Sequence, residues 1–205
     1  MSLFIASIYD RMLASTEAGC LMSWRRELLK NTGGDVLEIG AGTGANIFFY
    51  PDTVNSLVLS EPDPHMRRQL NKKIRKSNFD ITISAGTAEN IEAESESYDY
   101  VVTSLVCCSV AKLETSLFEI RRVLKPGGRF VFLEHVAAEP GTARRRWQNL
   151  LNPLWRKVAG NCHLNRETES AILAAGFNIL DIKRESMCKA PSLVKPTIRG
   201  LAEKP

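Results

Sequence analysis

The chain has 205 residues, of which 44% are hydrophobic and 24% are charged, as is typical of one soluble globular domain. Its net charge of +4 gives no strong case for the concentrated basic face of a nucleic-acid-binding protein, so we expect no nucleic-acid partner. Five cysteines without a C-x-x-C pair argue against a disulfide framework or a zinc site, and for a reducing compartment. No segment approaches the roughly 18 apolar residues that span a membrane, and no secretory leader is evident. We therefore expect no metal, no transmembrane segment and a cytoplasmic location, with weak peripheral membrane contact left open.

Apolar residues at helical spacing predict two amphipathic helices before residue 35. The first carries Ile5, Ile8, Tyr9, Met12 and Leu13, and the second carries Leu21, Trp24 and Leu28 before Gly33-Gly34. Three interpretations stay open at this point. The helices pack on the core, they form a lid with Tyr9 and Trp24 facing a ligand, or the first one touches a membrane surface.

A short apolar strand at residues 36–39 runs into the glycine-rich turn Gly40-Ala41-Gly42-Thr43-Gly44. Glycine lets the backbone approach a ligand closely and tolerates a positive φ, and a following helix would add partial positive charge. With Ala45, the turn satisfies the dinucleotide pattern G-x-G-x-x-G/A. With Glu38 two residues before Gly40, it equally satisfies the pattern of S-adenosylmethionine binders. The turn alone does not decide between the two ligands.

A second strand at residues 56–60 follows a short helix at 46–50, which Pro51 stops. Glu61 lies at the end of this strand, where a carboxylate can accept two hydrogen bonds from a ribose diol. Asp63 and Pro64 predict the start of the next helix, as its N-cap and its first residue. The basic residues of that helix are interpreted as its solvated face.

Three more strands are predicted at residues 81–83, 98–103 and 129–134, with a helix at 113–124 that Lys125-Pro126-Gly127-Gly128 stops. Strands alternate with helices five times, which predicts a parallel, doubly wound α/β sheet. Residues 143–158 predict a helix that is kinked or split at Pro153. Its expected apolar face consists of Trp147, Leu151, Leu154 and Trp155. Asn165 is expected to cap a helix ending at Gly176, followed by strands at 177–182 and 194–201, the last of unknown direction.

Five motifs follow one another in the order and spacing of class I S-adenosylmethionine-dependent methyltransferases, which residues 36–135 resemble. They are Val36 to Gly44, Glu61, Gly86-Thr87-Ala88-Glu89, Tyr98 to Val102, and Arg122 to Gly128. A narrower resemblance is to the methyltransferase-like seven family, which methylates small thiols. It rests on Gly44-Ala45-Asn46, Tyr50-Pro51, Leu105-Val106, Cys108-Ser109-Val110, Glu134-His135-Val136-Ala137, Trp147-Gln148, Leu164 and Arg166-Glu167-Thr168. Animal members of that family have a hydrophobic N-terminal anchor, which this chain lacks, so we do not expect membrane attachment.

The resemblance implies a Rossmann-like, doubly wound, mostly parallel seven-stranded sheet with helices on both faces. It implies a single domain, 1–205, with an N-terminal helical lid at 1–34, a cofactor-binding half at 35–135, and acceptor-side helices and last strands at 136–205. The cofactor is S-adenosyl-L-methionine, and the product is S-adenosyl-L-homocysteine. The implied cofactor-binding residues are Glu38, Gly40, Ala41, Gly42, Gly44, Asn46, Glu61, Pro62, Thr87, Ala88, Glu89, Ser104, Leu105 and Val106.

Within this set, the glycine turn would hold the methionine and sugar moieties, and Glu61 the ribose hydroxyls. Thr87 and Ala88 would lie along the edge of the adenine ring. Many relatives have Asp where this chain has Thr87, so Glu89 or a backbone carbonyl is left to contact the adenine amino group. Residues 104–107 would lie nearest the sulfonium.

Methyl transfer from a sulfonium is an in-line displacement that mainly requires alignment and exclusion of water. A thiol with a pKa of about 8.5 is partly ionised at neutral pH, so a thiol acceptor needs little acid–base machinery. The candidate catalytic base is His135, because it ends the fifth strand, where ligands of open α/β sheets collect. His163 and His65 are weaker candidates. Cys107 and Cys108 are interpreted as small hydrophobic residues rather than nucleophiles.

Several alternatives remain. The sequence Ser104-Leu105-Val106-Cys107 stands where methylases of nucleic-acid amines usually carry (Asp/Asn)-Pro-Pro-(Tyr/Phe), and Arg144-Arg145-Arg146 is interpreted as a solvated helix face. We therefore expect a small-molecule acceptor. Other hypotheses are an O- or C-methyltransferase of quinone-like acceptors, a catalytically silent cofactor-binding sensor or partner protein, and a nicotinamide oxidoreductase. The acceptor atom, the need for a base and the oligomeric state are not evident from the sequence.

Overall fold

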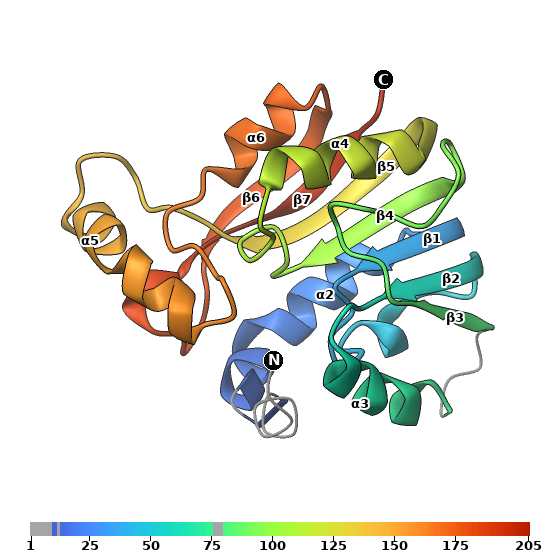
Figure 1. Cartoon of the computed structure of the whole chain (residues 1–205), viewed down its shortest axis with the longest axis horizontal. Coiled ribbons are helices and arrows are strands. Elements are labelled where there is room, and N and C mark those ends of the chain that lie inside the picture. Colours follow the sequence, from blue (N-terminus) through green and yellow to red (C-terminus); the bar gives the residue numbers. More distant parts are fainter. Residues whose placement is uncertain (1–9, 12, 76–79) are drawn as a thin grey trace.

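The computed structural model describes residues 10, 11, 13–75 and 80–205, and shows one seven-stranded sheet in the order β3-β2-β1-β4-β5-β7-β6 (Figure 1). Tyr9 and the apolar residues Ile5, Ile8 and Met12 of the first expected helix lie outside the described residues. The strands are β1 Gly34–Ile39, β2 Val54–Ser60, β3 Ile81–Ser84, β4 Tyr98–Ser104, β5 Leu124–His135, β6 Asn178–Ser186 and β7 Pro196–Glu203. The predicted doubly wound α/β sheet is confirmed.

The first five strands are parallel, and β1 lies between β2 and β4, with Val36 opposite both Leu57 and Tyr100. A strand buried on both faces is rich in apolar residues, which explains Val36, Leu37 and Ile39, while Glu38 is a buried exception. The last two strands depart from this pattern, because β7 pairs antiparallel with both β5 and β6. The direction of β7, which the sequence left open, is therefore antiparallel.

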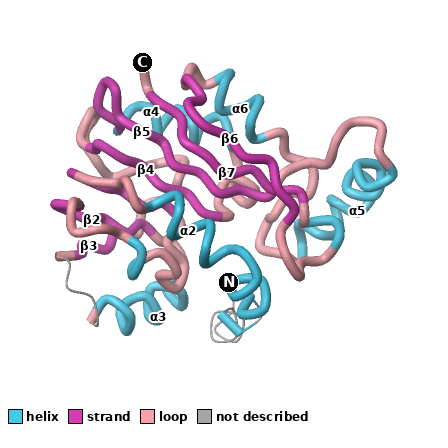
Figure 2. The backbone as a smooth tube through the Cα atoms, turned by 180° about the vertical axis from the view of Figure 1, so that it is seen from behind, coloured by secondary structure: helices cyan, strands magenta, loops and turns pink. Residues whose placement is uncertain are grey.

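Helices cover both faces of the sheet (Figures 1 and 2). Their bounds are η1 Glu17–Leu21, α2 Met22–Leu29, η2 Ile47–Phe49, α3 Pro64–Ile74, α4 Leu113–Val123, α5 Ala143–Val158, α6 Thr168–Ala174 and η3 Ser192–Val194. Leu117 of α4 and Ile172 of α6 share one core with Leu37 and Phe132, whereas Leu29 of α2 and Leu70 of α3 pack on the other face. The start of α3 is as predicted, since the Asp63 side chain accepts hydrogen bonds from the N–H groups of His65 and Met66.

The predicted start of β5 and the predicted N-cap of α6 are wrong. Strand β5 begins at Leu124 rather than at residue 129, because Leu124 pairs with Tyr98, and Gly127 N–H donates to the Lys204 carbonyl at 2.9 Å. Asn165 does not cap α6. Its side chain donates to Asn149 Oδ1, and the N-cap residue is Glu167.

Helix α5 is not split at Pro153, which lies within one helix. Much of its expected apolar face is exposed, because Trp147 is 55% exposed and Leu154 is 63% exposed, whereas Leu151 and Trp155 are half-buried. The buried residue is Gln148, whose side chain accepts from Ala138 N–H and donates to the carbonyls of Val136 and Leu193. These polar bonds turn the amide-bearing face inward and leave much of the apolar face in solvent. None of the helices in the described part of the chain combines the length and the apolar character that a membrane span requires.

Candidate active site

The glycine turn lies at the carboxyl end of β1, and Gly40, Gly42 and Gly44 all have positive φ values of 63°, 57° and 81°. A Cβ on Gly40 would lie 2.5 Å from Val106 Cγ2, and one on Gly44 would lie 2.5 Å from Ile47 Cδ1. Packing therefore demands glycine at both ends of the turn. At Gly42 the nearest atom would be the Gly40 carbonyl oxygen at 4.0 Å, so the middle of the turn faces open space. This is the surface on which a ligand can approach bare backbone.

Glu61 joins the end of β2 to this turn. Its Oε2 accepts the Gly42 N–H at 2.8 Å, and its Oε1 accepts the Asp63 N–H at 2.9 Å. Burial raises the pKa of Glu61, while these two N–H groups favour the carboxylate. A carboxylate has about four acceptor positions, so two remain for a pair of ligand hydroxyls. The neighbouring Pro62 is exposed.

Glu38 is buried behind the turn and holds it through other side chains. Its Oε1 accepts from Asn46 Nδ2 at 3.0 Å, and its Oε2 accepts from the Tyr50 hydroxyl at 2.7 Å. Burial raises the pKa of Glu38 to about 7, against the opposing effect of the Tyr50 bond and of the nearby Arg25. Asn46 also donates to Ser104 Oγ at 3.2 Å, so this network connects the turn to the end of β4. Glu38 is thus a supporting residue of the turn.

The described part of the N-terminal helices reaches over the same turn. Arg25 donates to Asn46 Oδ1 at 2.9 Å and pairs with Glu17, and Thr43 donates to Asp10. Trp24, in contrast, is only 7% exposed, and the Arg199 guanidinium lies 5.3 Å from the centre of its ring. Of the open interpretations, Trp24 therefore fits core packing, while Asp10 and Arg25 approach the candidate site.

The loop that follows β3 forms another side of the candidate site. Ser60 Oγ donates to the Gly86 carbonyl at 2.7 Å, which sets this loop beside the end of β2. Ala88 is buried and Thr87 is exposed. Glu89 Oε1 accepts the N–H of Ala111 at 2.7 Å and lies 3.3 Å from the N–H of Lys112, so this oxygen is engaged at the start of α4. A backbone carbonyl of the loop is left as the simpler acceptor for a ligand amino group.

The loop after β4 is held in an unusual conformation over the turn. Leu105 has a φ of +61°, which is rare for a residue with a branched side chain, and its N–H donates to the Leu133 carbonyl at 2.7 Å. The next residue, Val106, packs on Gly40, and its N–H donates to Glu134 Oε1 at 3.2 Å. Burial raises the pKa of Glu134. The sequence reasoning missed that Glu134 anchors this loop, although an acidic residue inside an apolar strand is a usable signal.

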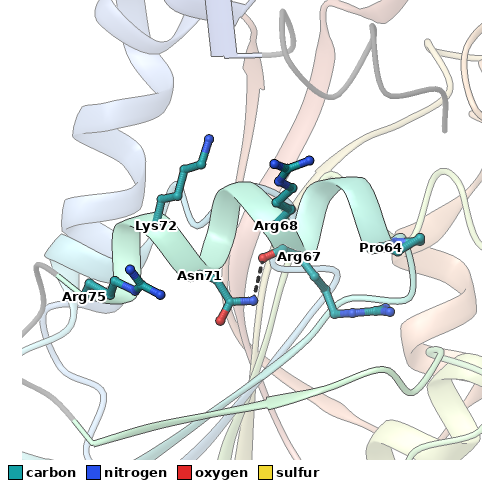
Figure 3. Close-up of a pocket in the computed structure, with 6 residues that line it drawn as sticks. All are labelled: Pro64, Arg67, Arg68, Asn71, Lys72 and Arg75. Atoms are coloured by element: carbon teal, nitrogen blue, oxygen red, sulfur yellow. Dashed lines mark hydrogen bonds between the residues drawn. The ribbon is translucent and has the colours of Figure 1, made fainter.

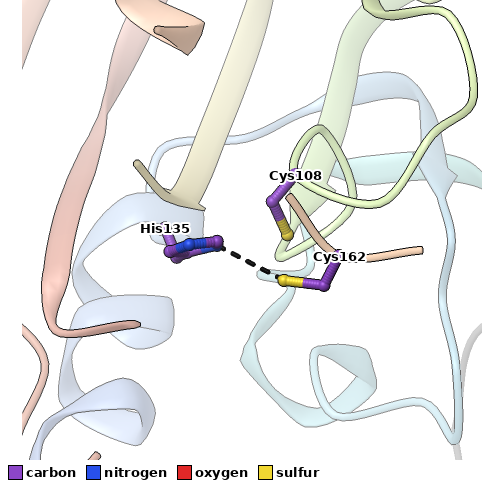
Figure 4. Close-up of side chains that lie close together, drawn as sticks. All are labelled: Cys108, His135 and Cys162. Carbon is purple, nitrogen blue, oxygen red and sulfur yellow. Dashed lines mark hydrogen bonds between the residues drawn. The ribbon is translucent and has the colours of Figure 1, made fainter. Parts of the chain in front are cut away.

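Beside this loop, Cys108, His135 and Cys162 come together from three separate segments (Figure 4). Their sulfur and ring nitrogen atoms lie within 4.8 Å of one another. His135 is 2% exposed, its Nδ1 lies 3.6 Å from Cys162 Sγ, and its Nε2 has no hydrogen-bond partner among the described residues. The Cys108 thiol and His135 together lower the pKa of Cys162 to about 4, whereas the Cys162 sulfur and burial raise that of Cys108. Cys107 is a buried core residue, as expected.

The loop that carries Cys162 is fixed by backbone contacts. His163 N–H donates to the Cys108 carbonyl at 2.7 Å, and Asn161 Nδ2 donates to the Ser109 carbonyl at 2.9 Å. Arg166 donates to the carbonyls of Cys107 and Val110. Burial and the positive charges of Arg166 and Arg156 lower the pKa of His163 to about 4, so its ring is neutral at physiological pH.

Most basic side chains of α3 point away from the site, although Lys73 donates to Asp10 at 2.9 Å and to Thr43 Oγ1 of the glycine turn at 3.4 Å. A shallow hollow along α3 is lined by Pro64, Arg67, Arg68, Asn71, Lys72 and Arg75, and the side chains in Figure 3 do not converge on a common point. Arg67 instead donates to the Glu61 carbonyl at 2.6 Å. Arg145 pairs with Glu167, while Arg144 and Arg146 are exposed, as expected for a solvated helix face.

The site therefore has two adjoining parts. One is a bare-backbone turn with a carboxylate suited to a diol, and this part fits a nucleoside-like cofactor on the open side of Gly42. The other is a buried imidazole beside two thiols. Both lie at the carboxyl ends of parallel strands, where ligands of open α/β sheets bind. Val106, which packs on Gly40, is two residues from Cys108, so the two parts share one loop.

Comparisons with known proteins agree with this geometry. Residues 37–132 match the methyltransferase domain family. The human thiol S-methyltransferase TMT1A is 37% identical over 96% of this chain and 82% of its own length. The ubiquinone/menaquinone biosynthesis C-methyltransferase UbiE of Rickettsia rickettsii is 26% identical over 77% of this chain and 69% of its own. A solved S-adenosylmethionine-dependent methyltransferase from Thermotoga maritima superposes with a TM-score of 0.70 at 20% identity, covering 99% of this chain and 97% of that one.

Proposed function

Because the chain belongs to the S-adenosylmethionine-dependent methyltransferase family that includes the thiol S-methyltransferases, we propose that the small molecule it methylates is a thiol. The single observation that carries this proposal is the buried imidazole of His135, whose Nε2 is free of partners among the described residues. It stands beside the loop that covers the glycine turn. A thiol is a soft and easily ionised acceptor, so one basic group such as this imidazole is enough to deprotonate it.

The cofactor is S-adenosyl-L-methionine, which supplies a methyl group already activated by the sulfonium. We propose that Gly40, Gly42 and Gly44 give it bare backbone and that Glu61 accepts its ribose hydroxyls. Glu38 supports the cofactor site indirectly, because Asn46 and Tyr50 occupy both of its carboxylate oxygens. The other proposed contacts are Ala41, Asn46, Pro62, Thr87, Ala88, Ser104, Leu105 and Val106, with Glu89 replaced by a backbone carbonyl of its loop.

At the acceptor end, His135 is the proposed catalytic residue. Nε2 takes the proton of the thiol, and Nδ1 faces the Cys162 sulfur at 3.6 Å. A thiol of pKa about 8.5 is only a few per cent ionised at pH 7, so a base raises the fraction of the nucleophilic form. The lowered pKa of His163 makes it a weak proton acceptor, and Cys107 belongs to the core, so His135 is the better placed base.

The proposed division of the domain follows the contacts. Residues 1–34 act as a lid, which is supported by the bonds of Asp10 and Arg25 to the glycine-turn region. Residues 35–135 bind the cofactor, and 136–205 shape the acceptor side. We also propose a cytoplasmic, reducing location, which is supported by five free cysteines.

Two alternatives remain testable. The likeness to UbiE favours a C-methyltransferase of a quinone precursor as the second candidate. A protein that binds the cofactor without turnover is the third.

The test is calorimetric titration with S-adenosylhomocysteine, followed by turnover of S-adenosylmethionine with a small alkyl thiol, a catechol and a hydroquinone in parallel. Binding with thiol turnover supports the proposal. Turnover with the hydroquinone alone supports the second candidate, and binding without any turnover supports the third.

A further inference from the structure

The chain has no C-x-x-C pair, but zinc ligands can also come from segments that are distant in sequence. Cys108 follows β4, His135 ends β5 and Cys162 precedes α6, and the parallel sheet brings the three to one edge (Figure 4). We infer that Cys108, His135 and Cys162 form a binding site for a thiophilic divalent cation of the Zn²⁺ type, with a fourth position open to the acceptor thiol.

The donor set is one that zinc uses. Two cysteine sulfurs and one histidine nitrogen with an open fourth position is the ligand set of catalytic zinc sites such as that of alcohol dehydrogenase. Zn–S bonds of about 2.3 Å and Zn–N bonds of about 2.0 Å in a tetrahedron place ligand atoms roughly 3.5 to 3.8 Å apart. The Cys162 Sγ to His135 Nδ1 distance is already 3.6 Å. The other ligand atoms are within 4.8 Å, so an adjustment of about 1 Å or less completes the site.

The surroundings suit a cation that is held on one side and open on the other. Cys108 and His135 are buried at 3% and 2% exposure, whereas Cys162 is partly exposed. The loop carrying Cys162 is fastened to Cys108 by the His163 N–H bond of 2.7 Å, which limits how far the two sulfurs can separate. A cation can therefore enter past Cys162 and meet two ligands that the sheet already positions.

Metal binding would change the role of His135. With Nδ1 bound to the cation, Nε2 carries a proton and cannot accept one from the acceptor. A bound cation would instead favour the thiolate form of the acceptor, whose proton would pass to solvent before methyl transfer. The open fourth position rests on the thiol acceptor proposed above, but the three-ligand site does not.

Spectroscopy with Co²⁺ as the probe tests the site directly. The protein is freed of metal with a chelator, titrated with Co²⁺, and then challenged with Zn²⁺. We expect one Co²⁺ per chain, a sulfur-to-cobalt charge-transfer band, and loss of that band on addition of Zn²⁺. The variant Cys162→Ser leaves the two buried ligands Cys108 and His135 in place, and it should weaken the band and lower Co²⁺ affinity by at least the roughly 10- to 100-fold that loss of a supporting residue costs.

Cys188→Ser is the matched control, because Cys188 is also partly exposed but lies beside Cys20 and is not one of the three cluster residues. It should leave both the band and the affinity unchanged. A missing band in the wild type, or a band equally strong in Cys162→Ser, would overturn the metal site.

Adding a small alkyl thiol to the Co²⁺-loaded protein tests separately whether the acceptor thiol binds at the open fourth position. A shift of the band with thiol methylation supports both inferences. A Co²⁺ band in a protein that methylates no thiol would contradict the proposed function and support the metal site. Thiol methylation without any Co²⁺ band would support the proposed function and contradict the metal site.

Discussion

The Glu61 carboxylate accepts the backbone N–H of Gly42 at 2.8 Å, so the acidic residue that ends β2 is tied directly to the glycine turn that ends β1. Two neighbouring parallel strands thereby present one surface. Bare backbone lies on one side of it and a diol-binding carboxylate on the other.

Replacing Glu61 with Ala should weaken binding of S-adenosylhomocysteine more than about tenfold, or about 1.4 kcal/mol, since both ribose hydrogen bonds and the support of Gly42 are lost. Calorimetric titration measures the affinity. Asp52→Asn, at an exposed position after Pro51, is the control and should change nothing. Affinity within twofold of wild type in the Glu61 variant would mean that the ribose assignment is wrong.

Stability should depend on pH through Glu38. Its pKa is about 7 in the folded protein against 4.5 as the ordinary value, so the folded state retains a proton that the unfolded state has released. The contribution of Glu38 to stability is therefore full below about pH 4.5, falls as the pH rises toward 7, and levels off above it, an effect of about 3 kcal/mol. Glu38→Gln should lack this slope.

Urea unfolding of the wild type and Glu38→Gln at pH 5 and pH 8 checks the prediction. The difference in free energy of unfolding between the two proteins should favour the wild type more at pH 5 than at pH 8. An equal difference at both values would contradict the assignment of the raised pKa to Glu38. Other buried carboxyl groups cancel, because they are present in both proteins.

Gly40→Ala should destabilise the fold and remove cofactor binding. The positive φ costs about 1–2 kcal/mol, and the new methyl 2.5 Å from Val106 adds roughly 1–3 kcal/mol of overpacking. Gly141→Ala is the matched control, since Gly141 has a φ of +80° but a Cβ added there would meet no atom within 4 Å. It should show the backbone cost alone in urea unfolding. Equal losses in the two variants would show that Val106 does not close against the turn.

An exposed leucine on α5 and a buried leucine on α4 should respond differently to substitution. Leu154 is 63% exposed, so Leu154→Gln should change the free energy of unfolding by no more than about 0.5 kcal/mol. Leu117 on α4 is fully buried, and Leu117→Ala should cost about 2–5 kcal/mol. A loss above about 2 kcal/mol for Leu154→Gln would mean that Leu154 is buried in the folded protein.

His135→Gln should lower kcat most for acceptor thiols that are neutral at the assay pH, because they depend on proton removal. A more acidic thiol, ionised without help, should lose less. Rates for a series of thiols of rising pKa give the comparison, with His65→Gln as the control on α3. A uniform loss across the series would assign His135 a structural role.

Features that depend on neighbours in sequence could be predicted. The glycine turn, the cap by Asp63 and the alternation of strands and helices are local patterns, and each recurs in the structure. The position of Glu61 at a strand end follows from the same rhythm. Such features need no knowledge of which distant segments meet.

Features formed by segments that are distant in sequence could not be predicted. Cys108, His135 and Cys162 lie in three separate segments, so no spacing rule brings them together. The pattern of α5 defined an apolar face, but the three hydrogen bonds of Gln148 determine which face turns inward. The role of Glu134 likewise depends on the loop after β4 folding back over β5.

The most direct test of the central claim is the ratio of kcat/KM for a small alkyl thiol to that for its oxygen analogue of the same carbon skeleton, with methylated product measured by mass spectrometry. We predict a preference for the thiol of more than about 100-fold, because only the thiol ionises near neutral pH. Equal rates, or methylation of the oxygen analogue alone, would contradict thiol S-methylation as the function of this site.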